Sequence, residues 1–597
     1  MLLIGCQHDA VAGITRPARQ CDCIVDQCEI GFEPDTEEFL DVDVGSQVSE
    51  RFADTVFHRS SPVDDVVPRP LEERFTELRS GQPEVPFHLD RPVSGTAAIG
   101  IEQHAVDIES QNTHCARLTH QGARSLHIVT PDEFRTHGHE LIDWIADYVG
   151  SVEQRAVGSA VAPGEVRSQL PEHPPTEPEP FERVMADVER VVVPGLTQWQ
   201  HPGFFAYFPS NTSFPSILGE LLSAGLGVQG MSWVTSPACT EVETLMLDWM
   251  QELLDLPTTF RSTSDTGGGV IQGTASEATL VAILSARWRA TAGAVNHDGD
   301  TTKLVAYTTS QAHSSIEKGL RIAGVGTDRI RVVPHDEAFA MRADALDEMI
   351  AADLADGLVP FFVCSTHGTT SSMAFDPTTS IGQVCRRHDV WLHVDAAMSG
   401  IAALAPEFRW VNDGLDFADS YCTNPHKWMG VNFDCNLYWT GDRHALLGAL
   451  SILPEYLRSE AAEAGAVIDY RDWQIPLGRR FRALKLWFTI RCEGVASFQE
   501  MIRRHVDLTQ ELADRVADDD RFEIVAPHPL NLLCIARRGD DGDAATDALI
   551  DTANATGEAL FTRTVLDGRS VLRISIGARS TERRHVESAW HLLDGLA

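Results

Sequence analysis

An alternation of strand-like and helix-like segments between residues 303 and 422 constrains the fold of this chain more than any other feature. Short apolar runs there alternate with amphipathic runs of helical periodicity. The expected strands are 303–308, 330–333, 359–365, 390–395 and 417–422, and the expected helices are 313–323, 343–355 and 381–388. This order predicts an α/β fold with a mostly parallel sheet that is covered by helices on both faces.

Three chemically useful residues lie at or just after the ends of expected strands. They are His313, Asp395 and, a few residues beyond its strand, Lys427. Ligands of parallel sheets bind at the carboxyl ends of the strands. Asp395 closes the apolar run WLHVD, and a buried carboxylate there needs a partner. We therefore expect a site that contains these three side chains.

Lys427 is one of only four lysines in the chain, and it lies between His426 and Trp428 in the apolar stretch DFADSYCTNPHKWMGVNFD. A poorly hydrated lysine has a lowered pKa and is nucleophilic at neutral pH, as Schiff-base chemistry with an aldehyde requires. The alternative is a structural lysine that pairs with a carboxylate such as Asp434. This stretch alone leaves both interpretations open.

A glycine-rich run precedes a strongly helical segment. Gly267 to Ser276 reads GGGVIQGTAS and continues into EATLVAILSARWRA, with Thr274 and Ser276 at the expected helix cap. Free N–H groups and the helix dipole at such a point bind phosphate, although a tight turn would explain the glycines equally well. The run matches neither common nucleotide-binding motif.

Length and charge limit the possible functions. The chain has 597 residues, enough for two to four domains, and a formal net charge of -39 that argues against nucleic acid or an anionic membrane as partner. No uncharged apolar run is long enough to span a membrane. The twelve dispersed cysteines suit reduced thiols, so a cytoplasmic location is expected, and a salt-adapted cytoplasm would explain the acidic composition.

The chain changes character near residue 129. Residues 1–128 show weak periodicity, and we expect a disordered extension or a misassigned start codon. Cys21, Cys23 and Cys28 with His8 leave a metal site open, but their spacing fits no common zinc pattern. From Thr130 a capping box and an amphipathic helix follow. At the other end, residues 485–597 read as a smaller α+β domain.

Pyridoxal 5′-phosphate is one cofactor that would use all of these features. Its aldehyde takes a lysine, its phosphate suits a glycine-rich helix N-terminus, and its pyridine nitrogen needs a buried carboxylate. The flat ring of His313 can cover one face of the cofactor. The sequence therefore predicts a pyridoxal-phosphate enzyme.

Six motifs carry a resemblance to a known family. They are GGGVIQGTASEATLVA, QAHSSIEK, HGTTSSMAFDP, WLHVDAAMSG, FADSYCTNPHKWMGVNFDC and DYRDWQIPLGRRFRALKLW. The chain resembles the pyridoxal-phosphate-dependent group II decarboxylases, and most of all their aromatic-L-amino-acid decarboxylase branch, over residues 130–597. The resemblance implies fold type I (aspartate aminotransferase-like) and a homodimer with shared active sites. It also implies a helical segment 129–213 that packs on the dimer partner, a large cofactor domain 214–484 and a small domain 485–597.

The resemblance also implies residue roles. Lys427 would form the internal aldimine, Asp395 would pair with the pyridinium nitrogen, and His313 would stack on the ring. Tyr456 aligns with a mobile-loop tyrosine thought to protonate the quinonoid carbon, which favours simple decarboxylation. The other expected cofactor contacts are Ala275, Ser276, Thr370, Ala397, Asn424 and His426. Aminotransferases usually clamp the substrate carboxylate with arginine, whereas loss of CO2 favours a less charged setting.

The resemblance is looser in the substrate pocket. Trp199, Tyr207, Phe208 and Pro209, in an aromatic stretch that could also be core, match the family's aromatic wall, and Gly478 resembles members that prefer indole substrates. Gln229 and Met231 occupy positions that are usually apolar and aromatic and that the family contributes across the dimer interface, and Met398 replaces a common tyrosine. We expect an aromatic L-amino acid as substrate. The alternatives are glutamate, histidine or 2,4-diaminobutyrate, a decarboxylating aldehyde synthase, or a non-catalytic or nucleotide-binding protein.

Overall fold

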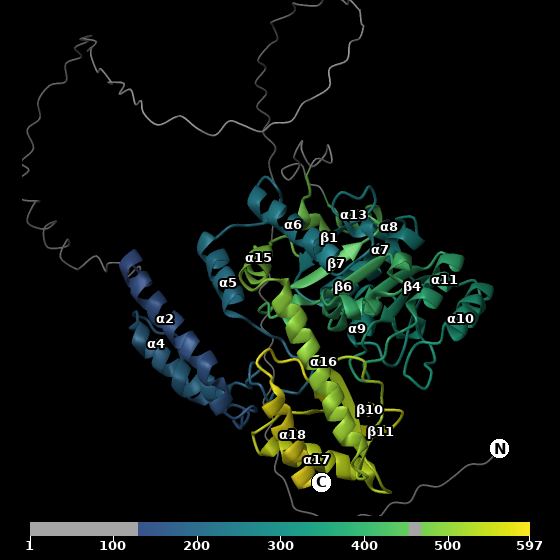
Figure 1. Cartoon of the computed structure of the whole chain (residues 1–597). Helices are drawn as coiled ribbons and strands as arrows, with labels where there is room; N and C mark the ends of the chain where they lie inside the picture. The colour runs from purple at the N-terminus through teal and green to yellow at the C-terminus, as the bar shows by residue number, and fades with distance from the viewer. Residues whose placement is uncertain (1–128, 453–466) are drawn as a thin grey trace, which may run out of the picture. The chain divides into compact units, whose positions relative to one another are not determined.

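The computed structural model describes residues 129–452 and 467–597 (Figure 1). The chain divides into two units after Asn112, and all described residues belong to the second unit. The expected extension at 1–128, with His8, Cys21, Cys23 and Cys28, lies outside the described residues, and so does Tyr456.

A seven-stranded sheet forms the centre of this unit, in the order β1-β7-β6-β5-β4-β2-β3. Its strands are β1 (Gly268–Gln272), β2 (Leu304–Thr308), β3 (Ile330–Val332), β4 (Val359–Thr366), β5 (Trp391–Asp395), β6 (Ser420–Thr423) and β7 (Asn436–Thr440). Strands β6, β5, β4, β2 and β3 run parallel, whereas β7 is antiparallel to both β6 and β1. The α/β class and the five predicted strands are confirmed, with boundary shifts of up to three residues.

Two strands of this sheet were not predicted. The glycine-rich run, expected as a loop, forms strand β1 up to Gln272, and β7 follows the lysine stretch. The glycines of β1 allow close packing, since a Cβ on Gly269 would lie 2.6 Å from Trp439 Cδ1 of the paired strand. Because close packing of glycines stabilises this strand, its sequence lacks the alternation of apolar and polar residues that predicts a strand.

Helices cover the sheet, and strands β1, β2, β5, β6 and β7 are buried along their whole length. Helix α7 (Ala275–Ala290) packs across β1 and β4 to β7, while α10 (Ala343–Ala355) and α11 (Thr378–His388) pack together on β4. The remaining helices around this sheet are α8 (Val295–Asp298), α9 (Ser315–Ile322), α12 (Pro425–Trp428) and α13 (Arg443–Leu450). The three predicted helices are confirmed.

A second, antiparallel sheet lies in the C-terminal part of the chain, in the order β10-β11-β9-β8. Its strands are β8 (Phe522–Ile524), β9 (Leu532–Arg537), β10 (Thr562–Leu566) and β11 (Arg569–Ser575). The helices of this region are α15 (Arg482–Glu493), α16 (Val495–Ala517), α17 (Gly542–Ala555) and α18 (Arg583–Leu596). Strand β10 was not predicted, because it is a sheet edge whose first four residues are only partly buried or exposed.

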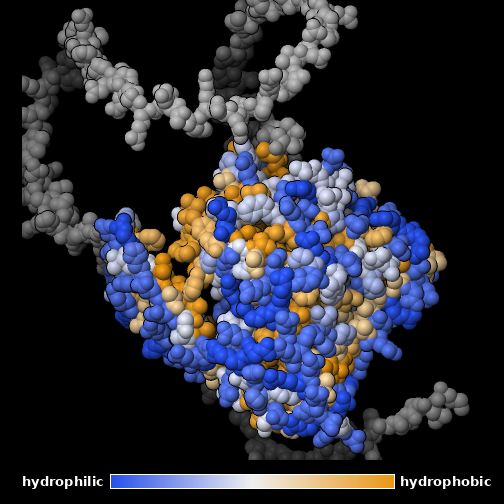
Figure 2. Space-filling view, viewed as in Figure 1, coloured by the Kyte–Doolittle hydropathy of each residue, from blue (hydrophilic) through white to orange (hydrophobic). Residues whose placement is uncertain are grey.

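Some of the N-terminal helices carry apolar side chains that the single chain does not bury. The N-terminal helices are α2 (Pro131–Ser151), α3 (Glu165–Ser168), α4 (Phe181–Asp187), α5 (Phe214–Leu226) and α6 (Pro237–Leu253). The predicted capping box of α2 is present, yet no residue of α2 is buried. In α5, five large apolar side chains are exposed, and Figure 2 shows hydrophobic surface in this region. The exposed side chains are Phe214, Leu218, Leu221, Leu222 and Leu226.

No helix within residues 129–452 and 467–597 is both long enough and apolar enough to cross a membrane.

Candidate active site

Lys427 lies in the short helix α12, directly after strand β6. Its amide N–H donates to the carbonyl of Asn424 at 2.9 Å, and its Nζ lies 5.6 Å from the centroid of the Phe208 ring. Burial lowers the pKa of Lys427, and the nearby Arg573 guanidinium adds to this, whereas Asp395 opposes it. The alternative pairing with Asp434 is wrong, because Asp434 accepts two hydrogen bonds of 3.1 Å from Arg482.

Asp395 ends strand β5 and is buried, with 5% of its surface exposed. Its Oδ1 accepts a hydrogen bond of 3.0 Å from the amide of Ala397, which holds the carboxylate in one orientation. Its negative charge raises the pKa of both Lys427 and His313 against the effect of burial. The three strand-end residues therefore lie within electrostatic range of one another, as expected.

His313 lies on the loop between β2 and α9. Its Nδ1 accepts a hydrogen bond of 3.2 Å from the amide of Ser315, which assigns the proton to Nε2. Burial lowers the pKa of His313, and the charge of Lys427 lowers it further. The imidazole is therefore neutral and held in a fixed orientation.

The N-terminus of α7 supplies free hydrogen-bond donors at Ala275 and Ser276. Thr274 is the N-cap but makes no side-chain cap bond, so the first N–H groups of the helix remain available. The preceding Gly273 donates its amide to the Glu277 carboxylate at 3.0 Å, and a Cβ at Gly273 would lie 3.0 Å from Asp434 Oδ2. Close approach to these carboxylates thus requires a glycine here.

Asn424 caps α12 and has a buried amide end without a partner. Its Oδ1, like the neighbouring Thr423 Oγ1, has no hydrogen-bond partner among the described residues. Because the two ends of an asparagine amide can exchange by a flip, this end can donate to an anion. The backbone amide of Asn424 donates to the carbonyl of Ala397 at 3.0 Å, which ties α12 to the loop after β5.

His426 lies in α12, next to Lys427. The amide of Cys435 donates to His426 Nδ1 at 3.0 Å, and burial lowers the pKa of His426 to about 3, so that its Nε2–H is a neutral donor. Thr370 lies on the loop after β4, next to Ser371. Ser371 accepts hydrogen bonds from Cys534 Sγ and Thr564 Oγ1 of the small sheet.

One residue of the expected aromatic wall, Phe208, borders Lys427. The rings of Trp199 and Tyr207 stack with centroids 5.6 Å apart, and both side chains are exposed, at 38% and 54%. Phe208 faces Lys427, and Pro209 lies against Gly577, where a Cβ would come 2.9 Å from its Cγ. Tyr207 has a φ of 54°, a conformation that a bulky residue adopts only under local constraint.

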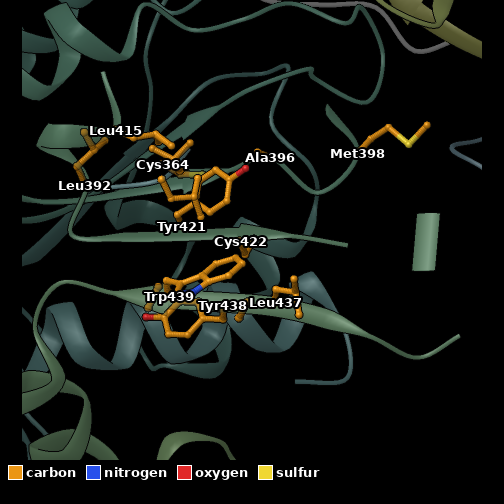
Figure 3. Packing of buried hydrophobic residues seen from close by; sticks show 14 of the residues in the cluster. Cys364, Leu392, Ala396, Met398, Leu415, Tyr421, Cys422, Leu437, Tyr438 and Trp439 are labelled. Atoms are coloured by element: carbon orange, nitrogen blue, oxygen red, sulfur yellow. The ribbon is translucent and has the colours of Figure 1, made fainter. Parts of the chain in front are cut away.

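Gln229, Met231 and Gly478 form a separate group. Gln229 Oε1 accepts from the amide of Arg479 at 2.8 Å, and a Cβ on Gly478 would lie 3.1 Å from Gln229 Nε2. The carbonyl of Met231 accepts from the amide of Arg471 at 2.9 Å. These contacts connect the group to residues 471–479 and not to Lys427. Met398 lies on the loop after β5, away from the labelled strand residues (Figure 3), and a Cβ on Gly577 would lie 3.2 Å from its Cε. Met398 therefore lies close to Pro209, which contacts the same glycine.

Two residues near Lys427 were not predicted. Arg573, on β11, is 3% exposed, and its Cζ lies 5.4 Å from the Phe208 ring centroid. Its Nη1 donates to Thr562 Oγ1 at 2.8 Å, but its Nε and Nη2 have no partner within the described part of the chain. A charged residue inside the apolar run VLRISI was the available sequence signal. A less charged setting was expected for the substrate carboxylate, and a buried guanidinium near Lys427 differs from that expectation.

Asn211 is the second unpredicted residue. Its side-chain amide donates to the carbonyls of Lys427 at 2.6 Å and Gly577 at 2.7 Å, and its Oδ1 accepts from the amide of Arg579 at 2.8 Å. Its backbone amide donates to the carbonyl of His426 at 3.0 Å. One asparagine thus connects the aromatic stretch, the lysine helix and the end of β11.

The residues present fit pyridoxal phosphate. Lys427 is a buried amine with no carboxylate salt bridge among the described residues, which suits the aldehyde of that cofactor. The free N–H groups of α7 and the buried Asn424 amide suit its phosphate, the buried carboxylate suits its ring nitrogen, and the neutral imidazole suits its ring face. Within the described ranges, no group of three or more His, Cys, Asp or Glu residues could hold a metal ion.

Comparisons with known proteins agree with this assignment. The profile of the pyridoxal-dependent decarboxylase conserved domain matches residues 163–537. An aromatic-L-amino-acid decarboxylase of Sus scrofa is 45% identical over 472 residues, which cover 78% of this chain and 96% of the relative. A phenylacetaldehyde synthase of Arabidopsis thaliana is 44% identical over 469 residues, which cover 77% of this chain and 95% of the relative.

A solved structure agrees as well. A crystal structure of Oryza sativa TDC with PLP and tryptamine has a TM-score of 0.76 and 40% sequence identity, covering 78% of this chain and 98% of that chain. The fold is therefore that of the pyridoxal-phosphate decarboxylases of fold type I. The chain belongs to the pyridoxal-dependent decarboxylase family and is a pyridoxal-phosphate-dependent amino-acid decarboxylase.

Proposed function

We propose that this protein decarboxylates an aromatic L-amino acid, of the Trp, Tyr, Phe or dopa type, to the amine and CO2. The observation that carries this proposal is the stacked pair Trp199 and Tyr207, followed in the chain by Phe208, which faces Lys427. An aromatic wall of this kind suits a flat side chain. The family relatives named for aromatic substrates support the same assignment.

Lys427, Asp395 and His313 have the central roles in this proposal. The lowered pKa of Lys427 favours the neutral, nucleophilic form of its amine, which can hold the cofactor covalently. Asp395 keeps a proton on the ring nitrogen, and the neutral His313 ring covers one face of the cofactor. When bound, pyridoxal phosphate supplies an electron sink for the electron pair that CO2 leaves behind.

Neighbouring groups would bind the phosphate and the ring substituents of the cofactor. The N–H groups of Ala275 and Ser276, the Asn424 amide and the Nε2–H of His426 are the phosphate donors in this proposal. Thr370 and Ala397 contact the ring substituents. Tyr456 remains the proposed proton donor to the substrate carbon.

We assign the substrate carboxylate to Arg573. Two of its nitrogens are buried without partners, and its guanidinium shares the Phe208 ring with Lys427. A charge-assisted hydrogen bond to a carboxylate would satisfy these donors. Arg573 therefore orients the substrate next to the aromatic wall.

A homodimer is the proposed assembly, with residues 129–213 packed on the partner subunit. The exposed apolar side chains of α2 and α5 support it, because a monomer would leave this surface in water. Gln229, Met231 and Gly478 would then complete the substrate pocket of the other subunit. Residues 214–484 form the proposed cofactor domain, residues 485–597 the small domain, and residues 1–128 an extension outside both.

The proposed location is the cytoplasm. The described cysteines are unpaired thiols, and all but Cys492 are buried. Reduced thiols are typical of that compartment.

Product analysis on a panel of amino acids tests the function. The purified holoenzyme is incubated with Trp, Tyr, Phe, dopa, His, Glu and 2,4-diaminobutyrate, and CO2, amine and aldehyde are quantified. Amine and CO2 from one or more aromatic substrates in equal amounts are expected. Turnover confined to His, Glu or diaminobutyrate would overturn the aromatic assignment.

The second candidate function is a decarboxylating aldehyde synthase. The 44% identity to a phenylacetaldehyde synthase favours it. Aldehyde in place of amine, in the same experiment, would select this function. The presence of Tyr456 supports amine formation.

A further inference from the structure

A line of buried polar side chains runs behind Asp395, on the side where β5 and β6 pair. The register of these strands places His393 opposite Ser420 and Asp395 opposite Cys422. All four side chains are buried. Figure 3 shows Cys422 beside Tyr438 and Leu437 of the next strand, within the hydrophobic core.

The hydrogen bonds along this line share one direction. The indole N–H of Trp391 donates to Ser420 Oγ at 2.9 Å, and Ser420 Oγ lies 2.9 Å from His393 Nδ1. We assign the Ser420 hydrogen to the bond with His393 Nδ1, which places the proton of His393 on Nε2, 3.9 Å from Cys422 Sγ. The thiol then donates to Asp395 Oδ1 at 3.9 Å.

The protonation states agree with this direction. Burial lowers the pKa of His393 to about 4 and raises the pKa of the Cys422 thiol well above its ordinary value. His393 is thus neutral, and Cys422 retains its hydrogen at neutral pH. An ionised carboxylate only accepts hydrogen bonds, so the thiol has one evident acceptor in Asp395.

We propose that Cys422 is a positioning residue that holds the Asp395 carboxylate oriented toward the ring nitrogen of the cofactor. This inference rests on the proposed function. Donation from Cys422 and from the Ala397 amide to the same Oδ1 fixes the carboxylate and leaves Oδ2 for the ring nitrogen. His393, Ser420 and Trp391 act through Cys422, because each orients the next donor in the line.

Several other groups surround Asp395. Lys427 and His313 face it from the cofactor side, Cys364 lies on the neighbouring strand β4, and the amide of His367 donates to its backbone carbonyl at 2.9 Å. Cys364 Sγ contacts the carbonyl of Ser365 at 3.8 Å. Of these two thiols, Cys422 is therefore the one that donates a hydrogen bond to the Asp395 carboxylate.

Cofactor binding to the apoprotein tests the proposal. Apoprotein is titrated with pyridoxal phosphate and with 1-deazapyridoxal phosphate, whose ring carries CH in place of the nitrogen, and tryptophan fluorescence reports binding. Sulfur hydrogen bonds are weak, so Cys422→Ala should raise the dissociation constant for pyridoxal phosphate about threefold. The same variant should leave the dissociation constant for the deaza compound unchanged, because that ring offers no proton to Asp395.

Two further variants complete the experiment. Cys422→Ser keeps a donor and should lie closer to the wild type than Cys422→Ala. Cys385→Ala removes a buried thiol from α11 and should leave the binding of both compounds unchanged. In the holoenzyme, Cys422→Ala should lower kcat and leave KM unchanged, since Cys422 is fully buried in the sheet.

Three results would overturn the inference. Equal weakening of both compounds would make Cys422 a packing residue, and an unchanged affinity for pyridoxal phosphate would remove its link to Asp395. An equally large effect of Cys385→Ala would have the same meaning. If the wild-type apoprotein binds neither compound, the proposed function fails and not this inference alone.

Discussion

Replacement of Arg573 by methionine should separate function from stability. Arg573 is buried, and two of its nitrogens have no protein partner among the described residues, so the burial of its charge lowers the stability of the fold. Each unsatisfied buried donor costs about 1–3 kcal/mol. Methionine has similar length and no charge, and it removes this penalty.

The expected gain in stability is modest. The substitution loses the hydrogen bond to Thr562, about 1 kcal/mol, and the contact with Phe208, also about 1 kcal/mol. Against a relieved penalty of about 2–6 kcal/mol, the free energy of unfolding of the apoprotein should rise by about 2 kcal/mol. Urea unfolding followed by fluorescence measures this change, with the slope checked for equality between variants.

The effect on catalysis should have the opposite sign. Loss of a charge-assisted bond to the substrate carboxylate, about 1.5–3 kcal/mol, lowers kcat/KM roughly ten- to hundredfold. Arg537→Met is the matched control, because Arg537 lies on the neighbouring strand β9 beside Phe522 and donates to the carbonyl of Ala597. It should leave kcat/KM unchanged. A less stable Arg573→Met apoprotein with an unchanged kcat/KM would refute the reasoning.

Four further predictions concern the site and the fold. Lys427→Ala should abolish the visible absorbance of the bound cofactor and all turnover, as absorbance spectra and product assays will show; persistence of both would exclude Lys427 as the covalent anchor. Gly269→Ala should lower the unfolding midpoint, because its Cβ would lie 2.6 Å from Trp439 and overpacking costs about 1–3 kcal/mol, whereas Gly138→Ala in α2, where no atom lies within 4 Å, should raise it slightly. Burial lowers the pKa of His367 and His393 to about 4 and of His426 and His505 to about 3, below the unfolded value of about 6.5. The contribution of these neutral histidines to the free energy of unfolding is therefore complete above pH 6.5 and is lost as the pH falls towards 4. The urea midpoint should therefore be lower at pH 5 than at pH 7.5. Asp376, with its pKa raised to about 6, gains stability as the pH falls, but this single group offsets only part of the loss from four histidines. An equal or higher midpoint at pH 5 would contradict this prediction. The net charge of -39 reflects salt adaptation if molar KCl raises the thermal midpoint, and an unchanged midpoint would exclude that explanation.

The sequence predicted the parallel part of the large sheet and the strand-end residues well. Strands such as β4 and β5 are continuous apolar runs because helices cover both of their faces, and Asp395 is conspicuous at the end of such a run. His313 and Lys427 follow from the same rule, since the carboxyl ends of parallel strands lie at one edge of the sheet.

Other features depend on contacts between distant segments, which local patterns do not contain. Gly269 lies in a strand where Trp439 leaves no room for a Cβ. Asp434 pairs with Arg482 and not with Lys427, although Lys427 is nearer in the sequence. Arg573 lies 146 residues after Lys427 in the sequence (573 minus 427), so its position beside Phe208 follows from the docking of β11. Gln229 and Gly478 are likewise distant in the sequence, so their contact could not be predicted from local patterns.

The asparagine at position 211 has a consequence for the order in which the site can assemble during synthesis. Its side chain joins the Lys427 carbonyl to Gly577 and Arg579, which follow Asn211 by 366 and 368 residues in the sequence. The ribosome makes these two residues long after Asn211 and Lys427, so the lysine helix lacks these attachments until the small sheet has been synthesised. Truncation of this C-terminal segment would therefore disturb the active lysine, although the segment lies outside the sheet that carries it.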